Sequence, residues 1–409
     1  MISLVVLPLM SGTFAGVGEP RGVVAARLAA VPPTPSLLQF GSSPVTIVCL
    51  GDSVTGVYYH TGGRRAYPEM LELAIRKALP QAQVKVINAG ISGHATTQGL
   101  ARLDRDVLQH KPDLVTISFG LNDMTRLTEE QFVANLKTLV VRCREAKAQV
   151  VLCTPNAVIT TSGRPVEKLV RYCDRIRELG RTLKVPVCDQ FAAGESLRAK
   201  DPWAWRLTMS DEIHPNMDGH KRMAQELCHT ITGKEVSLAE VRPPQDFLAK
   251  TKTLLNEGKP VKVLAMPPFD ALVSSALKQL HPQAVVEVTP WPTAGKSLAE
   301  LEQAAKQLVR AMKPNLVIAA VPANAPAATS DEEFVRSYSW TMNWSLSFGH
   351  QEWDCVVVHP SVVTPDISVP RGGLIRQLVH AQDLTLIDRP TGDRSPAEVL
   401  FTNALRQSP

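Results

Sequence analysis

The sequence predicts an α/β protein: a three-layer α/β/α sandwich built on a parallel sheet, followed by a second α/β domain of similar plan. Three observations support this prediction. Short apolar runs alternate with longer amphipathic stretches along most of the chain, which is the pattern of strand–helix–strand units. The short runs are apolar at nearly every position, as in strands that are buried on both faces. The second half of the chain also repeats the plan of the first.

Five apolar runs predict the strands of the first sheet. They span residues 46–50, 84–88, 114–119, 149–154 and 185–188. Amphipathic stretches predict the helices between and after these strands, at residues 67–78, 97–109, 129–146, 166–183 and 217–230. Because strand–helix–strand crossovers are right-handed, we expect the helices to cover both faces of a parallel sheet.

Two segments of the second half match the first half in one shared register. A strand is predicted at 261–266, and two further segments have counterparts 202 residues earlier. Val286-Glu-Val-Thr matches Val84-Lys-Val-Ile, and Lys313-Pro-Asn-Leu-Val matches Lys111-Pro-Asp-Leu-Val. We interpret the shared register as an ancient internal duplication. The alternative is that unrelated α/β domains simply share such strand patterns.

The domain organisation follows from these patterns. We predict a signal-like leader and proline-rich linker at 1–43, a first α/β domain at 44–233, a connector at 234–260 and a second α/β domain at 261–409. The first fifteen residues are apolar and end in small residues, as in a secretory signal. This predicts a periplasmic or secreted bacterial protein, or a cytoplasmic one if the segment is not a signal.

Composition excludes several classes of protein. The chain has 409 residues and a net charge of +5, with its lysines and arginines scattered rather than clustered. Nucleic-acid binding is therefore not expected. After the leader, no run is apolar enough to span a bilayer. The seven cysteines lie within apolar strand-like or helical patterns and lack metal-ligand spacing, so they are predicted to be buried free thiols.

Four spots in the first half carry residues suited to acyl transfer. Ser53 follows the first predicted strand, Gly93 the second and Asn122 the third, while Asp211 and His214 precede the last helix. Acyl transfer requires a hydroxyl nucleophile, a base, a carboxylate that orients the base, and donors for the oxyanion. Each residue alone also has a structural explanation, such as a helix cap or a turn former.

Together these residues resemble the SGNH hydrolase family, also called GDSL esterases and lipases. Its blocks occur in order as Gly51-Asp-Ser, Asn88-Ala-Gly-Ile-Ser-Gly, Gly120-Leu-Asn-Asp and Asp211-Glu-Ile-His-Pro. The resemblance covers about residues 45–232, and residues 91–103 are similar to the arylesterase, lysophospholipase and thioesterase branch. One block alone is weak evidence, whereas four blocks in order are specific.

The resemblance implies roles for these residues. Ser53 would be the nucleophile, His214 the general base and Asp211 the residue that orients it. The oxyanion would be held by the N–H groups of Ser53 and Gly93 and by the side-chain amide of Asn122. The implied fold is a flavodoxin-like sandwich, with no metal and no organic cofactor. The expected substrate is a short-chain acyl or acetyl ester of a carbohydrate or small molecule; lysophospholipids and thioesters are alternatives.

The second half keeps the pattern of the scaffold and loses the chemistry. When Val45 is laid on Val261, an offset of 216 residues, Phe269 stands opposite Ser53. At the offset of 202 residues, Gly295 and Asn324 match Gly93 and Asn122. We therefore predict a degenerate, non-catalytic copy. A rival hypothesis from another class is an acyl-glycan binding module with little or no turnover. The oligomeric state is not predicted.

Several neighbouring residues receive structural interpretations. Asp52 and Asp123 are predicted to hold their own turns. Tyr58, Tyr59 and His60 are interpreted as loop structure, with a substrate rim as the alternative. Trp203 and Trp205 fit a pocket wall or simple packing equally well. The spacing of Trp340, Trp344 and Phe348 predicts a core stripe on one helix face.

Overall fold

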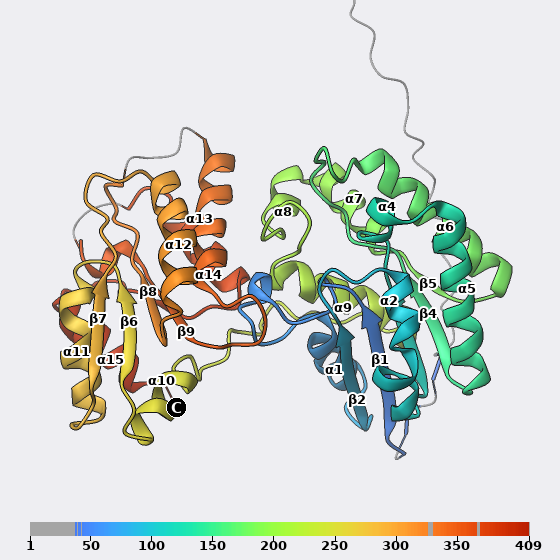
Figure 1. Ribbon diagram of the computed structural model, residues 1–409, viewed down its shortest axis with the longest axis horizontal. Helices are drawn as coiled ribbons and strands as arrows, with labels where there is room; N and C mark the ends of the chain where they lie inside the picture. The colour runs from blue at the N-terminus through green and yellow to red at the C-terminus, as the bar shows by residue number, and fades with distance from the viewer. Residues whose placement is uncertain (1–36, 39, 42, 326–329, 366–368, 409) are drawn as a thin grey trace, which may run out of the picture. The chain divides into compact units, whose positions relative to one another are not determined.

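The computed structural model of the protein contains two parallel sheets with helices packed against them (Figure 1). It describes residues 37–408 except 39, 42, 326–329 and 366–368. Most of the predicted leader therefore lies outside the described residues. The described chain from residue 37 onward belongs to one compact unit. The domain boundaries at 44–233 and 261–409 stay predictions.

The first sheet has the strand order β2-β1-β3-β4-β5. Its strands are β1 (Val45–Gly51), β2 (Val84–Gly90), β3 (Leu114–Ser118), β4 (Gln149–Cys153) and β5 (Val187–Cys188). All neighbouring strands pair in parallel. This is the α/β sandwich that the sequence predicts. The predicted strands differ from the observed ones by no more than two residues at either end.

The helices of the first half follow the predicted order. They are α1 (Tyr67–Ala78), α2 (Thr96–Ala101), α3 (Leu103–Asp106), α4 (Asp123–Arg126), α5 (Glu129–Glu145), α6 (Val166–Leu183), α7 (Gln190–Lys200), α8 (Pro202–Arg206) and α9 (Met217–Thr232), with the 3-10 turns η1 (Tyr59–Thr61) and η2 (Leu108–His110). The bounds of α1 and α6 are those predicted. Helices α4, α7 and α8 were not predicted, because each is short or only weakly amphipathic.

The prediction of one continuous helix at 97–109 is wrong. The chain leaves the helical conformation at Arg102, so the segment is divided into α2, α3 and η2. The buried guanidinium of Arg102 donates to the carbonyl oxygens of Ala89 at 2.7 Å and Gly51 at 2.8 Å. The break thus accompanies a side chain that satisfies carbonyl groups near the ends of β1 and β2.

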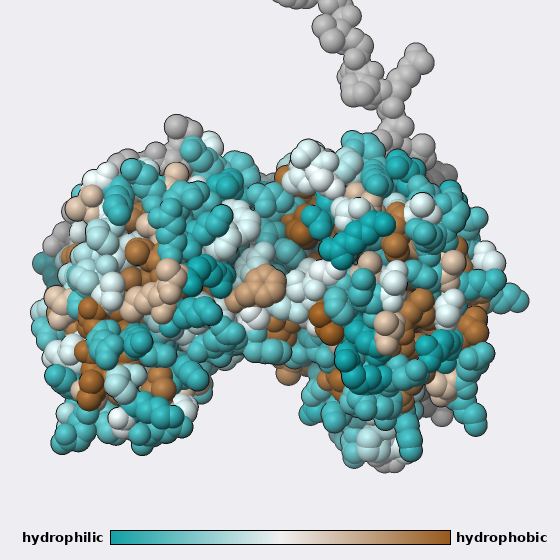
Figure 2. Space-filling model, viewed as in Figure 1, coloured by the Kyte–Doolittle hydropathy of each residue, from teal (hydrophilic) through white to brown (hydrophobic). Residues whose placement is uncertain are grey.

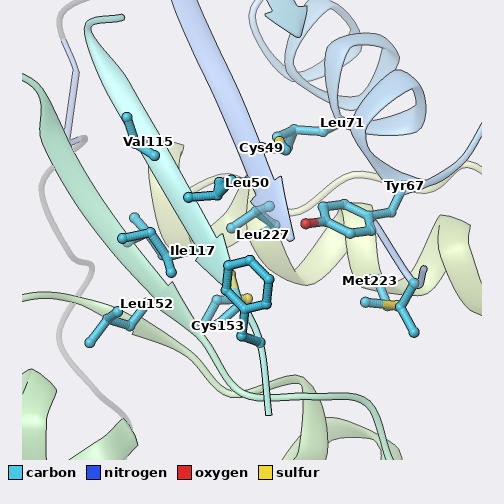
Figure 3. Close-up of a cluster of buried hydrophobic side chains, with 14 of the residues drawn as sticks. Cys49, Leu50, Tyr67, Leu71, Val115, Ile117, Leu152, Cys153, Met223 and Leu227 are labelled. Atoms are coloured by element: carbon cyan, nitrogen blue, oxygen red, sulfur yellow. The ribbon is translucent and has the colours of Figure 1, made fainter. Parts of the chain in front are cut away.

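The core of the first half lies on both faces of the sheet. Consecutive residues of β1, Cys49 and Leu50, are both fully buried, which requires a covered surface on each side of the strand. Figure 3 shows side chains of β1, β3 and β4 gathered with Tyr67 of α1 and Leu227 of α9. All seven cysteines are free and buried, as predicted, and burial raises the pKa of the Cys49 thiol to about 12.

The second sheet has the order β10-β9-β8-β6-β7, which is the order of the first sheet read from the opposite edge. Its strands are β6 (Val261–Ala265), β7 (Val286–Pro290), β8 (Leu316–Ala319), β9 (Asp354–Val358) and β10 (Leu386–Ile387). Its helices are α10 (Ala249–Asn256), α11 (Phe269–Leu280), α12 (Leu298–Met312), α13 (Asp331–Ser345), α14 (Gly372–Ala381) and α15 (Ala397–Arg406), with the 3-10 turn η3 (Pro360–Val362).

The two sheets also share their register and an ion pair. Val45 pairs with Val84 in the first sheet, and the matching residues Val261 and Val286 pair in the second. In each half an arginine donates two hydrogen bonds to an aspartate twelve residues later, just after the last strand. The pairs are Arg177 with Asp189 and Arg376 with Asp388. These repeats support the predicted duplication, and common ancestry itself stays a prediction.

The face of the molecule in Figure 2 is mostly hydrophilic, with hydrophobic residues in small separate areas. None of the helices that the structure describes has both the length and the apolar character needed to cross a bilayer.

Candidate active site

Three of the predicted site residues lie at one edge of the first sheet. Ser53 comes two residues after β1, Gly93 three residues after β2, and Asn122 four residues after β3. These strands are parallel neighbours in the order β2-β1-β3, so their carboxyl ends meet at the same edge. This edge is where open α/β sheets place their ligand sites.

The predicted carboxylate and base come from a tight turn before α9. An isolated bridge between Met209 and Pro215 closes this turn. Inside it, Oδ1 of Asp211 accepts hydrogen bonds from the backbone N–H groups of Ile213 and His214, each at 2.8 Å. The carboxylate is therefore held by the backbone of its own turn, which leaves Oδ2 free to face the imidazole ring.

A continuous hydrogen-bond chain joins Ser53, His214 and Asp211. Oγ of Ser53 lies 2.9 Å from Nε2 of His214, and Nδ1 of His214 lies 2.8 Å from Oδ2 of Asp211. Because a carboxylate only accepts hydrogen bonds, Nδ1 carries the ring proton and Nε2 is left to accept from the serine hydroxyl. This arrangement can take a proton from Ser53 as the hydroxyl attacks a carbonyl carbon.

The charges of the pair reinforce this arrangement. Burial alone would raise the pKa of Asp211, but the charge of His214 and the hydrogen bonds to the carboxylate outweigh burial and hold that pKa well below its usual range. Burial would lower the pKa of His214, but the charge of Asp211 and the hydrogen bond to it raise that pKa above the ordinary value of 6.5. Asp211 therefore stays ionised, and it stabilises an imidazolium at His214.

Tyr59 completes the surroundings of the carboxylate. Its hydroxyl donates to Oδ2 of Asp211 at 2.9 Å and lies 3.4 Å from Nδ1 of His214. Burial and the negative charge of Asp211 raise the pKa of Tyr59, so the phenol remains a proton donor. The interpretation of Tyr59 as loop structure did not include this contact with Asp211.

His60 lies directly against the ring of His214. The two imidazoles are stacked with centroids 4.6 Å apart and an angle of 5° between their planes. The plane of His60 is also nearly parallel to that of His220, with centroids 5.4 Å apart and an angle of 8°. Both His60 and His220 are fully buried. Three parallel imidazole rings therefore extend from the candidate base into the protein interior.

Hydrogen bonds indicate one tautomer for each of the inner rings. The backbone N–H of Tyr67 donates to Nδ1 of His220 at 3.0 Å, so the proton of His220 is on Nε2. Nε2 of His60 lies 3.0 Å from the carbonyl oxygen of Ser53, which can only accept, so this nitrogen is protonated. Nδ1 of His60 then faces Nε2 of His220 at 3.4 Å as an acceptor.

Both inner rings are held in the neutral form. Burial lowers the pKa of His220 to about 3. Burial, together with the charges of the two neighbouring histidines, lowers the pKa of His60 well below its usual range. A neutral ring beneath His214 avoids the repulsion that a second cation would create when His214 takes up a proton.

The side chain of Asn122 is held with its amide nitrogen toward the loop that follows β2. Its Nδ2 donates to the carbonyl oxygen of His94 at 3.0 Å, and its Oδ1 accepts from Nη2 of Arg164 at 3.2 Å. These two bonds fix which end of the amide carries the N–H groups. Gly93, next to His94, has a φ of +74°, a conformation that glycine adopts without strain.

Asp52 and Asp123 hold turns, as predicted. Oδ1 of Asp52 accepts from the N–H of Val54 at 3.0 Å, and burial raises its pKa to about 6. Oδ2 of Asp123 accepts from the N–H of Gly120 at 3.1 Å, whereas Oδ1 accepts from the N–H of Thr96 at 2.8 Å. Asp123 thus also ties the loop after β2 to the loop after β3.

The predicted aromatic residues divide between packing and surface positions. Trp205 is buried, with the guanidinium of Arg198 3.4 Å from its ring centroid, and it also lines a cavity together with Thr208 and Pro215. Phe348 does not belong to a core stripe, because α13 ends at Ser345 and Phe348 is 54% exposed. Its ring instead contacts Tyr58 at 5.4 Å and Tyr59 at 6.1 Å between centroids.

A hydroxyl, an imidazole and a buried carboxylate joined in this order, at the ligand edge of an open α/β sheet, define a site of the serine hydrolase type. Comparison with known proteins agrees with this class. Residues 49–222 match the model of the GDSL-like lipase/acylhydrolase family.

Curated relatives carry esterase names. The chain is 36% identical over 181 residues to an arylesterase of Vibrio mimicus, covering 44% of this chain and 84% of the relative. It is 26% identical over 172 residues to an acetylxylan esterase of Geobacillus stearothermophilus, covering 38% and 76%. Among solved structures, a lipase/acylhydrolase from Enterococcus faecalis has a TM-score of 0.40 and 29% identity, covering 47% of this chain and 97% of that one.

The chain belongs to the GDSL-like lipase/acylhydrolase family and is an ester hydrolase. Sequence reasoning missed the parts played by Tyr59, His60 and Arg164. The one available signal was the run of polar aromatic residues Tyr58-Tyr59-His60 shortly after Ser53. No sequence pattern pointed to Arg164.

Proposed function

We propose that this enzyme hydrolyses its ester through an acyl-enzyme on Ser53, with His214 as general base and Asp211 as the carboxylate that orients it. The observation that carries the proposal is the hydrogen-bond chain from Oγ of Ser53 through His214 to Asp211, with both distances below 3 Å. The two-sided support of Asp211, from its own turn and from Tyr59, keeps this chain in a single geometry.

The proposed reaction has two steps. In the first step, Oγ of Ser53 attacks the ester carbonyl carbon while its proton passes to Nε2 of His214. The tetrahedral intermediate then collapses, the C–O bond to the alcohol breaks, and His214 returns the proton to the leaving oxygen. In the second step, a water molecule attacks the acyl carbon while His214 takes up its proton. The bond between the acyl carbon and Oγ of Ser53 then breaks, His214 returns the proton to Oγ, and the carboxylic acid leaves.

The negative oxygen of each tetrahedral intermediate needs donors. We assign this role to the backbone N–H groups of Ser53 and Gly93 and to Nδ2 of Asn122. Nδ2 has two N–H groups, and only one is used by the carbonyl of His94. Arg164 is assigned a positioning role, because its bond to Oδ1 directs Nδ2 toward the loop that carries Gly93.

The proposed substrate is a short-chain ester, such as an acetyl ester of a carbohydrate or another small molecule. Two relatives support this class by name, the acetylxylan esterase of G. stearothermophilus and the arylesterase of V. mimicus. A relative from Escherichia coli is named thioesterase 1/protease 1/lysophospholipase L1, which supports a thioester or a lysophospholipid as the second candidate.

Hydrolysis of p-nitrophenyl acetate and of its longer acyl homologues tests the proposal, with wild type and Ser53→Ala compared at equal concentration. We expect measurable activity that falls with acyl length and drops to near background in the variant. A fluorophosphonate probe should label Ser53 in the wild type. Wild-type activity that survives in Ser53→Ala, or labelling at another residue, would refute the assignment of the nucleophile.

A further inference from the structure

The second half of the chain contacts both loops that carry the proposed catalytic groups. One loop, residues 58–65, follows β1 and contains Tyr59. The other, residues 209–215, contains Asp211 and His214. The contacts come from two buried amides of the second half, Gln382 at the end of α14 and Asn343 in α13.

Gln382 bonds to both loops at once. Its side chain is 1% exposed, and its Nε2 donates to the carbonyl oxygen of Tyr59 at 2.8 Å and to Oδ1 of Asn343 at 2.7 Å. The same nitrogen lies 3.1 Å from Oγ of Ser210. A single amide group therefore connects the backbone of Tyr59 with the residue that precedes Asp211.

Asn343 makes two contacts with Ser210, in the loop of residues 209–215. Its Oδ1 accepts from Oγ of Ser210 at 3.1 Å, and its Nδ2 lies 3.3 Å from the carbonyl oxygen of Ser210. The N–H of Ser210 in turn donates to the carbonyl oxygen of His214 at 2.9 Å. Asn343 thus acts on the turn that supplies the proposed base and carboxylate.

Further contacts hold the 58–65 loop against the second half. The buried carboxylate of Asp383 accepts two hydrogen bonds from Arg65, at 2.6 and 2.7 Å. At Gly62, where φ is +67°, an added Cβ would lie 2.9 Å from the carbonyl oxygen of Gln382. The backbone of this loop therefore packs directly on the end of α14, with no room for a side chain.

We propose that the second half is a built-in support for the catalytic loops, and that Gln382 and Asn343 are positioning residues for ester hydrolysis. The inference rests on the proposed roles of Tyr59, Asp211 and His214. Tyr59 must place its hydroxyl 2.9 Å from Asp211, and Gln382 holds the backbone of the same residue. Small displacements in such a site are costly, since a shift of about 1 Å can reduce a rate by about 100-fold.

The chemistry of the contact separates positioning from simple adhesion. Two surfaces can associate through apolar contacts alone. Buried amides, in contrast, are destabilising unless all of their hydrogen bonds are formed. Here the amides of Gln382 and Asn343 bond to each other and to backbone atoms of both loops. Such directional bonds specify where the two loops lie relative to each other.

The test uses the full-length chain with Gln382→Met, which keeps the length of the side chain and removes its hydrogen bonds. We expect kcat for p-nitrophenyl acetate to fall by about 10- to 100-fold, with KM changed by less than the fall in kcat. Asn343→Ala should act in the same direction. The matched control is Glu332→Gln, which removes a different contact between the halves, the 2.6 Å ion pair with Arg206, and should leave kcat unchanged.

Two further measurements separate positioning from loss of folding. Fluorophosphonate titration counts the molecules that have a reactive Ser53. If Gln382 is a positioning residue, the lower kcat of Gln382→Met must remain after the rate is divided by the number of labelled sites. In a double-mutant cycle, Tyr59→Phe and Gln382→Met should be non-additive, since Gln382 is proposed to act through Tyr59. Additive effects, wild-type kcat in Gln382→Met, or an equal loss in Glu332→Gln would each overturn the inference. An inactive wild type would instead overturn the proposed function.

Discussion

Replacing Tyr59 by Phe tests the electrostatics of the proposed triad. The substitution removes one oxygen and keeps the ring that packs beside His214. Asp211 accepts four hydrogen bonds, from the hydroxyl of Tyr59, the ring of His214 and the backbone N–H groups of Ile213 and His214. After the change, the imidazole of His214 is the only side chain of the described residues that donates to Oδ2.

The direction of the effect follows from this competition. The Tyr59 hydroxyl neutralises part of the carboxylate charge, so its removal leaves more of that charge to stabilise the imidazolium of His214. The pKa of His214, already raised by Asp211, should rise further. A hydrogen bond to a charged group is worth roughly 1.5–3 kcal/mol, and one pKa unit corresponds to about 1.4 kcal/mol. If half of the bond energy is transmitted to His214, the shift is about 0.5–1 unit.

The measurement is the pH dependence of kcat/KM for p-nitrophenyl acetate. In the wild type, kcat/KM should fall as the pH drops through the pKa of His214, which lies above 6.5, because only the neutral ring can accept the Ser53 proton. In Tyr59→Phe this acid limb should move to higher pH. The matched control is Tyr338→Phe in the second half, whose buried hydroxyl has no partner among the described residues.

The outcome is decisive in both directions. A limb that moves to lower pH in Tyr59→Phe would show that the hydroxyl does not compete for the Asp211 charge. An unmoved limb would show that Tyr59 does not bond to the carboxylate in the working enzyme. A shift of equal size in Tyr338→Phe would show that the effect comes from stability alone.

Three other predictions concern the oxyanion donors, stability at acid pH and the glycines of the site. Asn122→Ala should lower kcat about 100- to 1,000-fold with little change in KM, measured by steady-state kinetics; a smaller loss would remove Asn122 from the oxyanion hole. The free energy of unfolding in urea should fall below pH 6.5 by about 2–3 kcal/mol per pH unit because of His60 and His220. The unfolded chain binds two protons there, whereas the folded rings stay neutral because their pKa values are lowered. A His60→Gln/His220→Gln variant should show a weaker dependence of the free energy of unfolding on pH. Gly90→Ala should lower the Tm far more than Gly93→Ala. At position 90 an added Cβ would lie 2.2 Å from the backbone nitrogen of Gly56, whereas at position 93 it would meet open space. Similar losses of Tm would contradict this reasoning.

The features that could be predicted from the sequence are those encoded locally. Strands such as β1 (Val45–Gly51) are apolar at nearly every position because both faces are buried, and α6 (Val166–Leu183) shows a clear helical period. The positions of Ser53, Gly93 and Asn122 followed from the same rule, because the ends of parallel neighbouring strands meet at one edge. Each of these inferences needs only a residue and the element next to it.

The features that the sequence did not reveal depend on partners far away in the chain. The hydroxyl of Tyr59 bonds to a residue 152 positions later, and Gln382 bonds to one 323 positions earlier. No local pattern distinguishes a tyrosine with such a partner from one in an ordinary loop. The break at Arg102 was missed for the same reason, since it depends on carbonyl groups of two strands rather than on the helical period around it.

The two halves share a sheet topology, but they do not share a nucleophile. The sheet of the second half repeats the order and register of the first, yet at the position of Ser53 the second half carries Phe269, which is fully buried. A buried apolar side chain there stabilises the second half and offers no nucleophile. The polar residues that matter to the reaction lie instead on α13 and at the end of α14, where Asn343 and Gln382 meet the catalytic loops. If the second half is retained for what it supports, substitutions of Asn343 and Gln382, which bond to the catalytic loops, should reduce turnover. Substitutions at the edge of its own sheet should affect stability alone.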